Sequence, residues 1–300
     1  MIVPRILPRI APLVDLSHEA GTLSLMVSRV RIVPFVAAAM LGVFACTDDT
    51  TVTPPSTPAI DPVPAATPAP PRVLLYTKET EWYHPSTPVA LQVMTDRGKA
   101  RGWTITASKD SAIFTVDSLT KFDVVVFLNS SGMTMSQPER DAFAGYIAEG
   151  HGWVGAHAAS HTDYDWSFMH EVVGANFCCH PPVVQANVLV QDTSDPLVSH
   201  LPAVWAHADE WYTYDSRPEN NPRVKVLLAL DEKSVRPDYP GPDQPQVLSV
   251  GFHATTWKQQ LGATRSFYTG LGHTPETWHD ENFIIMMLKA VEWAGGKGPP

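Results

Sequence analysis

The sequence predicts an α/β protein with a doubly wound, mostly parallel sheet, and three observations carry this prediction. Residues 72–76 and 123–129 form short, almost continuous apolar runs, which are typical of strands buried on both faces of a parallel sheet. Helix signals lie between such runs, so strands and helices alternate along the chain. Residues 152–160 add a buried strand that ends at a small-residue turn and opens a helix. Ligands bind at junctions of this kind in open α/β sheets.

The first two predicted strands enclose a helix. After strand 72–76 and a loop, Ser86 or Thr87 can cap a helix that has Pro88 in its first turn. Residues 103–107 then alternate Thr and Ile, which indicates a second strand. The order up to this point is therefore strand, helix, strand.

The third and fourth predicted strands enclose the next helix. Residues 123–129 are the strongest candidate for a fully buried strand. Ser136 and Glu139 form a capping box that opens a helix ending at Gly150. The strand 152–157 follows.

The second half of the sequence is less regular. The connection 158–182 is rich in aromatic residues and histidines, which indicates a lid or pocket wall. Residues 283–293 form an amphipathic closing helix. Four further runs are predicted as strands: 183–190, 224–230, 247–252 and 265–269.

Composition narrows the class of protein. The 300 residues are 44% hydrophobic and 17% charged, as in a globular protein of one or two domains. The net charge of −10 argues against a nucleic-acid partner, which requires clustered Lys and Arg.

The N-terminal part is typical of an export signal. Arg29 and Arg31 precede the apolar run 32–45, and Cys46 follows directly, as in a bacterial lipoprotein signal. The run is short for a transmembrane helix. An ordinary secretory signal and a single-pass anchor are the alternatives. We expect an exported periplasmic or cell-envelope lipoprotein that meets the membrane through lipid on Cys46.

The chain divides into three predicted parts. Residues 1–46 are the leader, in which Met26 would be a natural start. Residues 47–71 are rich in Pro and Thr and predict an extended, disordered linker. The folded domain is expected over 72–296.

Polar side chains follow the predicted strands at their carboxyl ends. A parallel sheet brings such ends to one edge, so we expect these side chains to converge. Each also has a structural alternative, such as closing a turn or capping a helix. The candidates are Tyr83, His84, Asn129, His157, His161, His180, Asp209, Glu210, Trp211, Tyr212 and His273.

His157 takes the place that Ser or Cys holds at the strand-to-helix turn of nucleophile-elbow enzymes. Two interpretations of this histidine stay open. It is either a hydrogen-bonded group at a strand end, or a general base or ligand-binding group, since imidazole titrates near neutral pH.

Cys178 and Cys179 are adjacent, which disfavours a disulfide between them, and the chain has no CxxC pair. We expect buried thiols, with a redox-active cysteine as the alternative.

Several segments together resemble the ThuA-like family, named after a trehalose-utilisation protein. The resemblance covers about residues 72–296 and implies a flavodoxin-like, class I glutamine amidotransferase-like fold. It gives no support for amidotransferase activity, because the nucleophile of that superfamily is replaced by the His157 segment. The matching segments are 73–77 with 83–84, 123–129, 152–160, 180–182, 209–212 and 268–274.

Two positions depart from the family pattern. Family members often carry His-Pro where this chain has Asp195-Pro196, and often a small residue in place of Cys179. We expect both departures to be tolerated variation in the pocket wall.

The resemblance implies a role in disaccharide utilisation, with a carbohydrate or keto-sugar as ligand. Enolisation of a keto-sugar suits the residues, with His157 and His273 as catalytic groups and Asp209 or Glu210 orienting them or accepting protons. Such an enzyme would be of isomerase, lyase or hydrolase type without a Cys nucleophile. No cofactor is required, and a divalent metal held by some of these His and Asp side chains is an open alternative.

Non-catalytic binding is the rival interpretation. Trp82, Tyr83, Trp166, Trp211 and Tyr212 could form stacking faces for a sugar at the cell envelope. A structural domain with a degenerate amidotransferase-like pocket is a further alternative. The expected substrate-binding residues are Tyr83, His84, Asn129, His161, His180, Trp211 and Tyr212.

Lipidation of Cys46 is directly testable. Metabolic labelling with a fatty-acid analogue should mark the wild-type chain and leave Cys46→Ala unlabelled, because the lipid would be attached through that thiol. Equal labelling of the two proteins would contradict lipidation and would leave export open.

Overall fold

The computed structural model describes residues 69–235 and 250–296, and these residues belong to one compact unit. The expected leader, Cys46 and residues 47–68 of the linker lie outside the described residues. Among the described helices, none combines the length and the apolar character needed to cross a bilayer.

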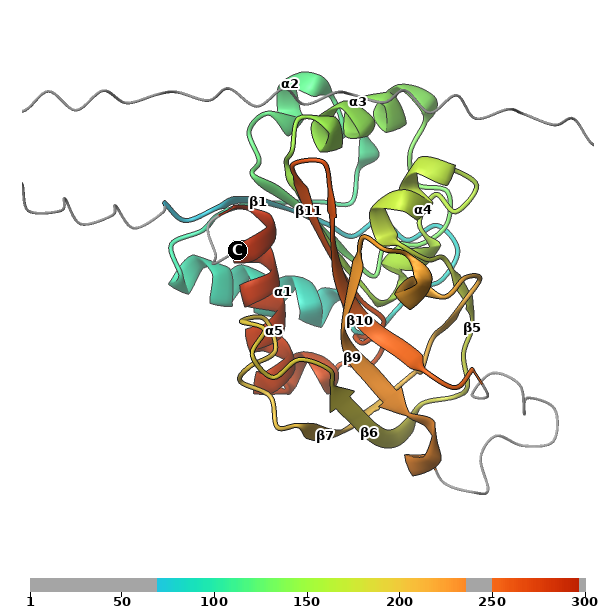
Figure 1. The fold of residues 1–300 in the computed structure, drawn as a ribbon. Coiled ribbons are helices and arrows are strands. Elements are labelled where there is room, and N and C mark those ends of the chain that lie inside the picture. Colours follow the sequence, from blue (N-terminus) through green and yellow to red (C-terminus); the bar gives the residue numbers. More distant parts are fainter. Residues whose placement is uncertain (1–68, 236–249, 297–300) are drawn as a thin grey trace, which may run out of the picture. The chain divides into compact units, whose positions relative to one another are not determined.

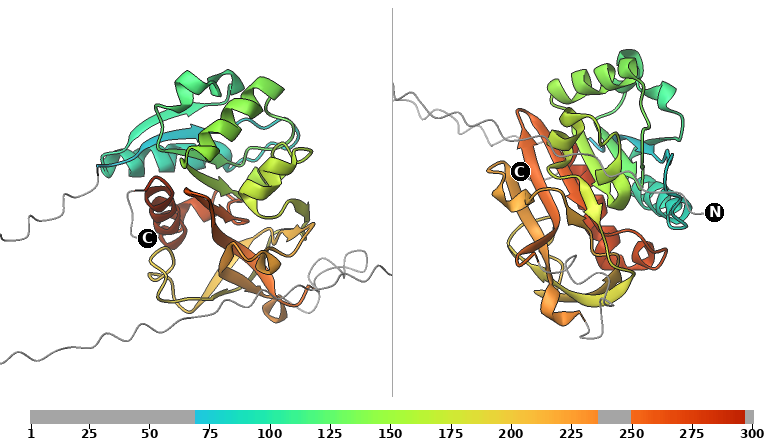
Figure 2. Two further views of the ribbon diagram at one scale, coloured as in Figure 1. Left: turned by 45° about the horizontal axis from the view of Figure 1, so that its top comes forward. Right: turned by 90° about the vertical axis from the view of Figure 1, so that its right-hand side faces the viewer.

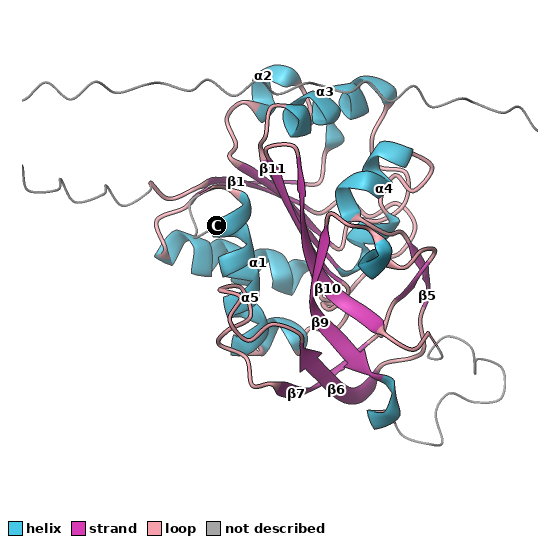
Figure 3. Ribbon diagram, viewed as in Figure 1, coloured by secondary structure: helices cyan, strands magenta, loops and turns pink. Residues whose placement is uncertain are grey.

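Within the described residues, nine strands form one central sheet (Figures 1 and 3). Five neighbouring strands pair in parallel: β2 (Thr104–Ser108), β1 (Arg72–Tyr76), β3 (Val124–Leu128), β4 (Gly152–Ala156) and β11 (Thr264–Thr269). Four antiparallel strands continue the sheet beyond β11: β10 (His253–Leu261), β9 (Val224–Asp231), β6 (Val184–Val190) and β7 (Val204–Asp209). A separate two-stranded sheet pairs β5 (Phe177–Cys179) with β8 (Thr213–Tyr214).

Helices cover both faces of the parallel strands (Figure 2). Successive side chains of a strand point to opposite faces. Val73 and Leu75 therefore share a core with α1 (Thr87–Ala100) and α5 (Glu281–Ala294). Leu74 and Tyr76 share the core on the other face with α3 (Gln137–Ala148) and α4 (Ser167–Val173). The short α2 (Val116–Leu119) lies beside α3.

The predicted fold class is confirmed as α/β with a mostly parallel central sheet. Ser86 is the N-cap residue of α1, and the capping box of Ser136 and Glu139 opens α3. The closing helix α5 buries the apolar face expected of 283–293.

The strand predicted over 247–252 is wrong in the part that the structure describes, residues 250–252. Residues 247–249 lie outside the described residues, 250–252 precede the strand, and β10 begins at His253. The sequence of β10 has no apolar pattern typical of a buried strand, because the strand buries polar side chains that have hydrogen-bond partners inside the protein. The Thr256 hydroxyl lies 2.8 Å from that of Thr269, and the Gln259 amide donates to the Val172 carbonyl oxygen at 2.9 Å.

The connection 158–182 also has more regular structure than a loop. It contains α4 and β5, which explains how so many aromatic residues are held in place. Cys178 is exposed and Cys179 is half-buried, so the expectation of two buried thiols is wrong. Both are free, and their sulfur atoms lie 2.7 Å apart.

The direction of β7 decides where Asp209 lies. Each step from β11 through β10, β9 and β6 to β7 reverses the strand direction, so β7 runs the same way as β4 and β11. Asp209, at the end of β7, therefore lies at the same edge of the sheet as the carboxyl ends of the parallel strands.

Asp195 is a structural residue and not part of a pocket wall, contrary to the sequence-based expectation. Its buried carboxylate pairs with Lys225 of β9 and Lys258 of β10, each at 2.9 Å. Burial alone would raise the pKa of Asp195, but the two ammonium groups and the Leu197 amide lower it. The aspartate thus fastens the β6–β7 loop to the sheet.

Replacing Asp195 with Asn should lower the free energy of unfolding by about 1–3 kcal/mol at neutral pH, because a buried charge partner is removed. Below about pH 4 the difference should shrink, since the lowered pKa stabilises the fold only where the unfolded aspartate is ionised. Urea unfolding followed by Trp fluorescence measures both effects. Asp192→Asn is the control, because Asp192 shares Lys225 but is only partly buried and should matter little. Equal losses in the two variants would contradict the assignment.

Candidate active site

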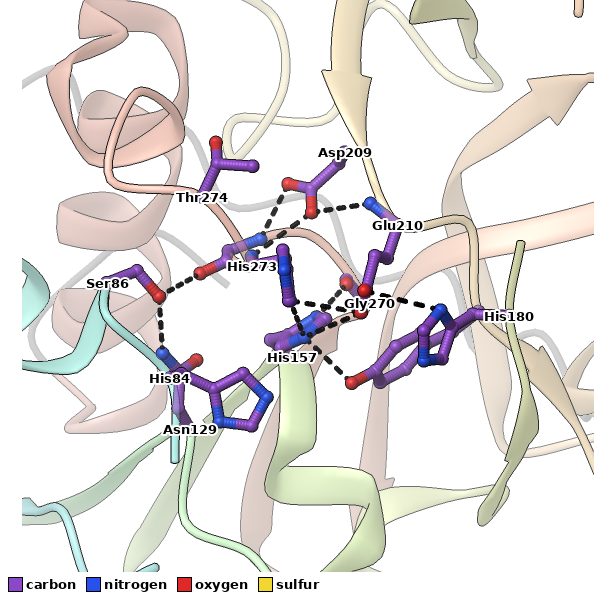
Figure 4. Close-up of polar contacts among 12 residues, drawn as sticks. His84, Ser86, Asn129, His157, His180, Asp209, Glu210, Gly270, His273 and Thr274 are labelled. Carbon is purple, nitrogen blue, oxygen red and sulfur yellow. Dashed lines mark hydrogen bonds and ion pairs between the residues drawn. The ribbon is translucent and has the colours of Figure 1, made fainter. Parts of the chain in front are cut away.

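Three histidines from three separate segments meet at the carboxyl edge of the parallel strands (Figure 4). His84 lies in the loop after β1, His157 directly follows β4, and His273 lies in the loop after β11. Their ring centroids are 5.0 Å (His84–His157), 5.1 Å (His157–His273) and 5.7 Å (His84–His273) apart. The structure thus brings together the histidines that the strand-end argument grouped.

His157 forms the turn between β4 and the short helix that follows it. Its backbone adopts the left-handed conformation with a φ of 51°, which costs roughly 1–3 kcal/mol for a residue with a side chain. Its Nδ1 donates to the Gly270 carbonyl oxygen at 2.9 Å, and its own carbonyl oxygen accepts from the Tyr268 hydroxyl at 2.8 Å. Complete burial lowers the pKa of His157, against an opposing effect of Glu210. The neutral imidazole that results carries its lone pair on Nε2.

Three groups surround the Nε2 atom of His157. The Tyr212 hydroxyl lies 2.7 Å from it, Nδ1 of His273 3.2 Å, and the Glu210 carboxylate 3.5 Å. The same carboxylate contacts Nδ1 of His273 at 3.0 Å and Nδ1 of His180 at 3.4 Å. Glu210 is therefore the carboxylate that joins the histidines.

The charges of Glu210 and His273 are mutually dependent. Burial alone would raise the pKa of Glu210, but hydrogen bonds with His157 and His273 lower it to about 2. Burial alone would lower the pKa of His273, but its hydrogen bond to Glu210 raises it. The pair consequently favours an ionised carboxylate beside a protonated imidazole.

His84 is oriented by Glu79. One carboxylate oxygen of Glu79 accepts from the His84 backbone amide at 2.9 Å and contacts Nδ1 of its ring at 2.8 Å. The Thr87 hydroxyl donates to the same oxygen at 3.0 Å. Since Nδ1 is held by the carboxylate, Nε2 is the ring nitrogen left for another partner.

Asp209 holds the loop that carries His273. Its fully buried carboxylate accepts from the backbone amides of Gly272 (2.8 Å), His273 (3.1 Å) and Glu210 (2.9 Å), and from the Thr277 hydroxyl (2.9 Å). Burial alone would raise the pKa of Asp209, but nearby His207, His157 and the Gly272 amide lower it. With both oxygens occupied, Asp209 is a positioning residue; the expected catalytic role is not favoured by its contacts.

An open pocket of about 300 Å³ lies over this group. Trp82 and Tyr83 stand at its rim with 45% and 74% of their surfaces exposed. Its aromatic walls are Trp82, Tyr83, Phe177 and Tyr212, and its polar lining is His84, His180, Glu210 and His273. Buried His157 is not part of the lining and reaches the pocket through its neighbours.

Several expected substrate-binding residues lie elsewhere. Trp211 is fully buried, and its indole donates to the Val184 carbonyl oxygen at 2.9 Å. Asn129 is also fully buried and donates to the Ser86 hydroxyl, so its role is structural. His161 contacts Glu81 at 2.9 Å and supports the Trp82 ring from behind the pocket lining.

Trp166 packs against Phe168 and Arg140, away from the pocket. Sequence reasoning missed Glu79 and Phe177. Glu79 lies in the loop after β1, so the strand-end argument that selected His84 could have included it. Phe177 had no such signal, because its position depends on the pairing of β5 with β8.

Two kinds of chemistry fit this arrangement. A carboxylate and an imidazole beside a small pocket can move a proton to and from a bound molecule. One ring nitrogen from each of His84, His157 and His273 also lies within 4.8 Å of the others, so these residues can hold a metal ion. The elbow position lacks a Ser or Cys, so covalent catalysis of the amidotransferase kind has no nucleophile there.

The positioning role of Asp209 can be tested by Asp209→Asn. An amide has only one acceptor oxygen for four donors, so the free energy of unfolding should fall by roughly 1–3 kcal/mol or more. Chemical denaturation measures this loss. Increased mobility of the His273 ring, measured by NMR, would show that the loop is released. Glu276→Gln, an exposed carboxylate in the same loop, is the control. Identical stability of the two variants would contradict the assignment.

Comparisons with known proteins agree with this architecture. The solved structure of a ThuA-like protein from Bacteroides uniformis is 24% identical, with a TM-score of 0.64, covering 78% of this chain and 94% of that one. A ThuA-like protein from Parabacteroides merdae is 19% identical, with a TM-score of 0.60 and coverages of 76% and 91%. These likenesses show a shared fold. A search of the curated proteins finds no match. The family model described as ThuA, trehalose utilisation, matches residues 72–294, and the chain therefore belongs to the ThuA family.

Proposed function

We propose that this protein acts on a keto-sugar in disaccharide utilisation and that its pocket transfers a proton next to the sugar carbonyl. The observation that carries the proposal is the placement of Glu210 and His273, 3.0 Å apart, in the lining of an open, aromatic-walled pocket. Membership of the trehalose utilisation family supports a sugar as the ligand. The leader sequence alone supports our further proposal that the protein works at the cell envelope, anchored through Cys46.

Glu210 is the best-placed proton acceptor. Its carboxylate lies in the pocket lining and contacts the three imidazoles of His157, His180 and His273. In an enolisation, the carboxylate takes the proton from the carbon next to the carbonyl. The electron pair of that C–H bond forms the enolate double bond, and the carbonyl oxygen becomes negative. Reprotonation of the same carbon from its other face gives an epimer. If the hydroxyl on that carbon also passes its proton to the enolate oxygen, reprotonation of the former carbonyl carbon gives the isomer, with the carbonyl moved to the neighbouring carbon.

The histidines are placed to stabilise the enolate oxygen. Charge that develops in a partly desolvated pocket is stabilised by fixed donors and cations more strongly than in water. His273 lines the pocket beside Glu210, and His84 lines it as well, with its ring centroid 5.7 Å from that of His273. The proposed base thus stands directly beside the imidazoles that would stabilise the enolate oxygen.

The proposed role of His157 differs from the catalytic role expected from sequence. It is fully buried, absent from the pocket lining, and bonded through Nδ1 to Gly270. Its pocket-lining neighbours His273 and Tyr212 are both held at its Nε2 atom. We therefore assign His157 to orienting the cluster.

The rim supports a sugar as the occupant. Trp82 and Tyr83 are large aromatic side chains with substantial exposed surface above a polar floor. A sugar ring has an apolar face and a rim of hydroxyl groups, which matches this division. The same feature favours the second candidate function, which is carbohydrate binding without catalysis.

Glu210→Gln should separate these two functions. Loss of the base should reduce solvent-proton exchange into a bound keto-sugar by on the order of a hundredfold or more, while sugar binding persists. NMR in deuterated water, run over a panel of keto-sugars and parent disaccharides, measures exchange and binding in one sample. Glu171→Gln, on α4 and outside the pocket, is the matched control. Unchanged exchange in Glu210→Gln would contradict the proposed base, and wild-type binding without exchange would favour the non-catalytic function.

A further inference from the structure

We propose that His84, His157 and His273 bind one divalent first-row transition metal ion, for which zinc is the best fit. The ion would be the electrophile of the pocket; this role, but not the binding itself, rests on the proposed function. Three imidazole ligands with a remaining open position are the ligand set of catalytic zinc sites.

Ring geometry is the first argument. Tetrahedral zinc with Zn–N bonds of about 2.0 Å places ligand nitrogens roughly 3.3 Å apart and imidazole centroids roughly 5 Å apart. Nε2 of His157 and Nδ1 of His273 are 3.2 Å apart. The three centroid distances are 5.0, 5.1 and 5.7 Å, and one nitrogen from each ring lies within 4.8 Å of the others. A small movement of His84 toward the other two rings would complete a coordination sphere.

The partners of the remaining ring nitrogens are the second argument. A histidine that binds a metal through one nitrogen usually donates its other N–H to a carboxylate or a backbone carbonyl. His84 meets the Glu79 carboxylate through Nδ1 at 2.8 Å, and His157 donates Nδ1–H to the Gly270 carbonyl oxygen at 2.9 Å. Both contacts select the tautomer whose Nε2 carries the lone pair. Two of the three ligands are therefore already oriented for coordination.

Backbone support is the third argument. His157 is held at a left-handed turn, the His273 amide is bonded to buried Asp209, and the His84 amide is bonded to Glu79. The three side chains are thus fixed from their main chains before any ion arrives. Among residues 69–235 and 250–296, this is the one group of three or more His, Cys, Asp or Glu side chains with ligand atoms so close together.

Glu210 gives the proposed ion a chemical use. It lies beside His157 and His273, yet is not a member of the three-histidine group. His84 and His273 open onto the pocket, so a substrate oxygen can approach a metal held there. A bound metal polarises a carbonyl as a Lewis acid. The site would then pair a metal-bound carbonyl with the adjacent carboxylate base.

Metal content provides the first test. The full-length chain would be equilibrated with Zn²⁺, passed through gel filtration and analysed by mass spectrometry of the metal, with about one zinc per chain expected. His84→Ala and His273→Ala should each reduce the retained zinc at least tenfold. His180→Ala is the matched control, because His180 lines the same pocket outside the group and should retain zinc like the wild type. A wild type without retained zinc, or equal retention in all three variants, would overturn the proposal.

A conservative variant guards against loss of folding. Glu79→Gln keeps the shape of the residue that orients His84 and should weaken zinc binding roughly 10- to 100-fold in calorimetry. Co²⁺ in place of zinc should give visible absorption bands typical of tetrahedral coordination, and His273→Ala should abolish them. Unchanged affinity in Glu79→Gln together with unchanged bands in His273→Ala would overturn the site.

The two proposals fail in different ways. Proton exchange into a keto-sugar that continues after the metal is removed by a chelator would refute the electrophilic role of the ion and leave the base intact. Retained zinc without exchange for any keto-sugar would refute the proposed reaction and leave the metal site intact.

Discussion

A buried carboxylate joins the two halves of this sheet at the place where the pocket forms. Asp209 ends β7, the last antiparallel strand, and accepts hydrogen bonds from Gly272 and His273 in the loop after the parallel strand β11. On a flat sheet, four strand spacings would separate β7 from β11 by about 19 Å. The contact therefore requires the antiparallel strands to curl back toward the loop. Glu210 follows Asp209 in the chain, and the His273 amide is bonded to the Asp209 carboxylate. The contact therefore also brings Glu210 and His273 together.

The charge of Asp209 is buried, and hydrogen bonds within the protein compensate for its burial. An ionised carboxylate without partners in the protein interior would be strongly unfavourable, but four donors converge on this one. The donors are mostly backbone amides, which cannot move away without opening the loop. The pocket lining is consequently rigid on this side, as a site for oriented chemistry requires.

The other side of the pocket depends on strain at His157. A left-handed backbone at a residue with a side chain persists only where its surroundings hold it. Gly270 and Tyr268 provide this support through hydrogen bonds to the ring and the carbonyl oxygen. The turn resembles the strained turn of nucleophile-elbow enzymes, with an imidazole at the position of their nucleophile. A group that orients neighbours or binds a metal suits that replacement better than one that attacks a substrate.

The sequence by itself determined the parallel strands, the helices between them and the edge on which the site lies. Apolar runs such as 123–129 identify strands buried on both faces, and parallel pairing then places His84, His157 and His273 at one edge. The capping box of Ser136 and Glu139 is equally visible, because it depends on neighbouring residues alone. Ser86 begins α1 without a side-chain cap bond, and its hydroxyl donates instead to the distant Gly272 carbonyl oxygen. The tertiary structure decided what depends on distant contacts. Contacts with residues far along the chain determine the burial of polar β10, the position of Asp209 and the burial of Trp211. Loop geometry determines the pairing of Glu79 with His84. The spacing of apolar residues in the sequence predicts none of these features.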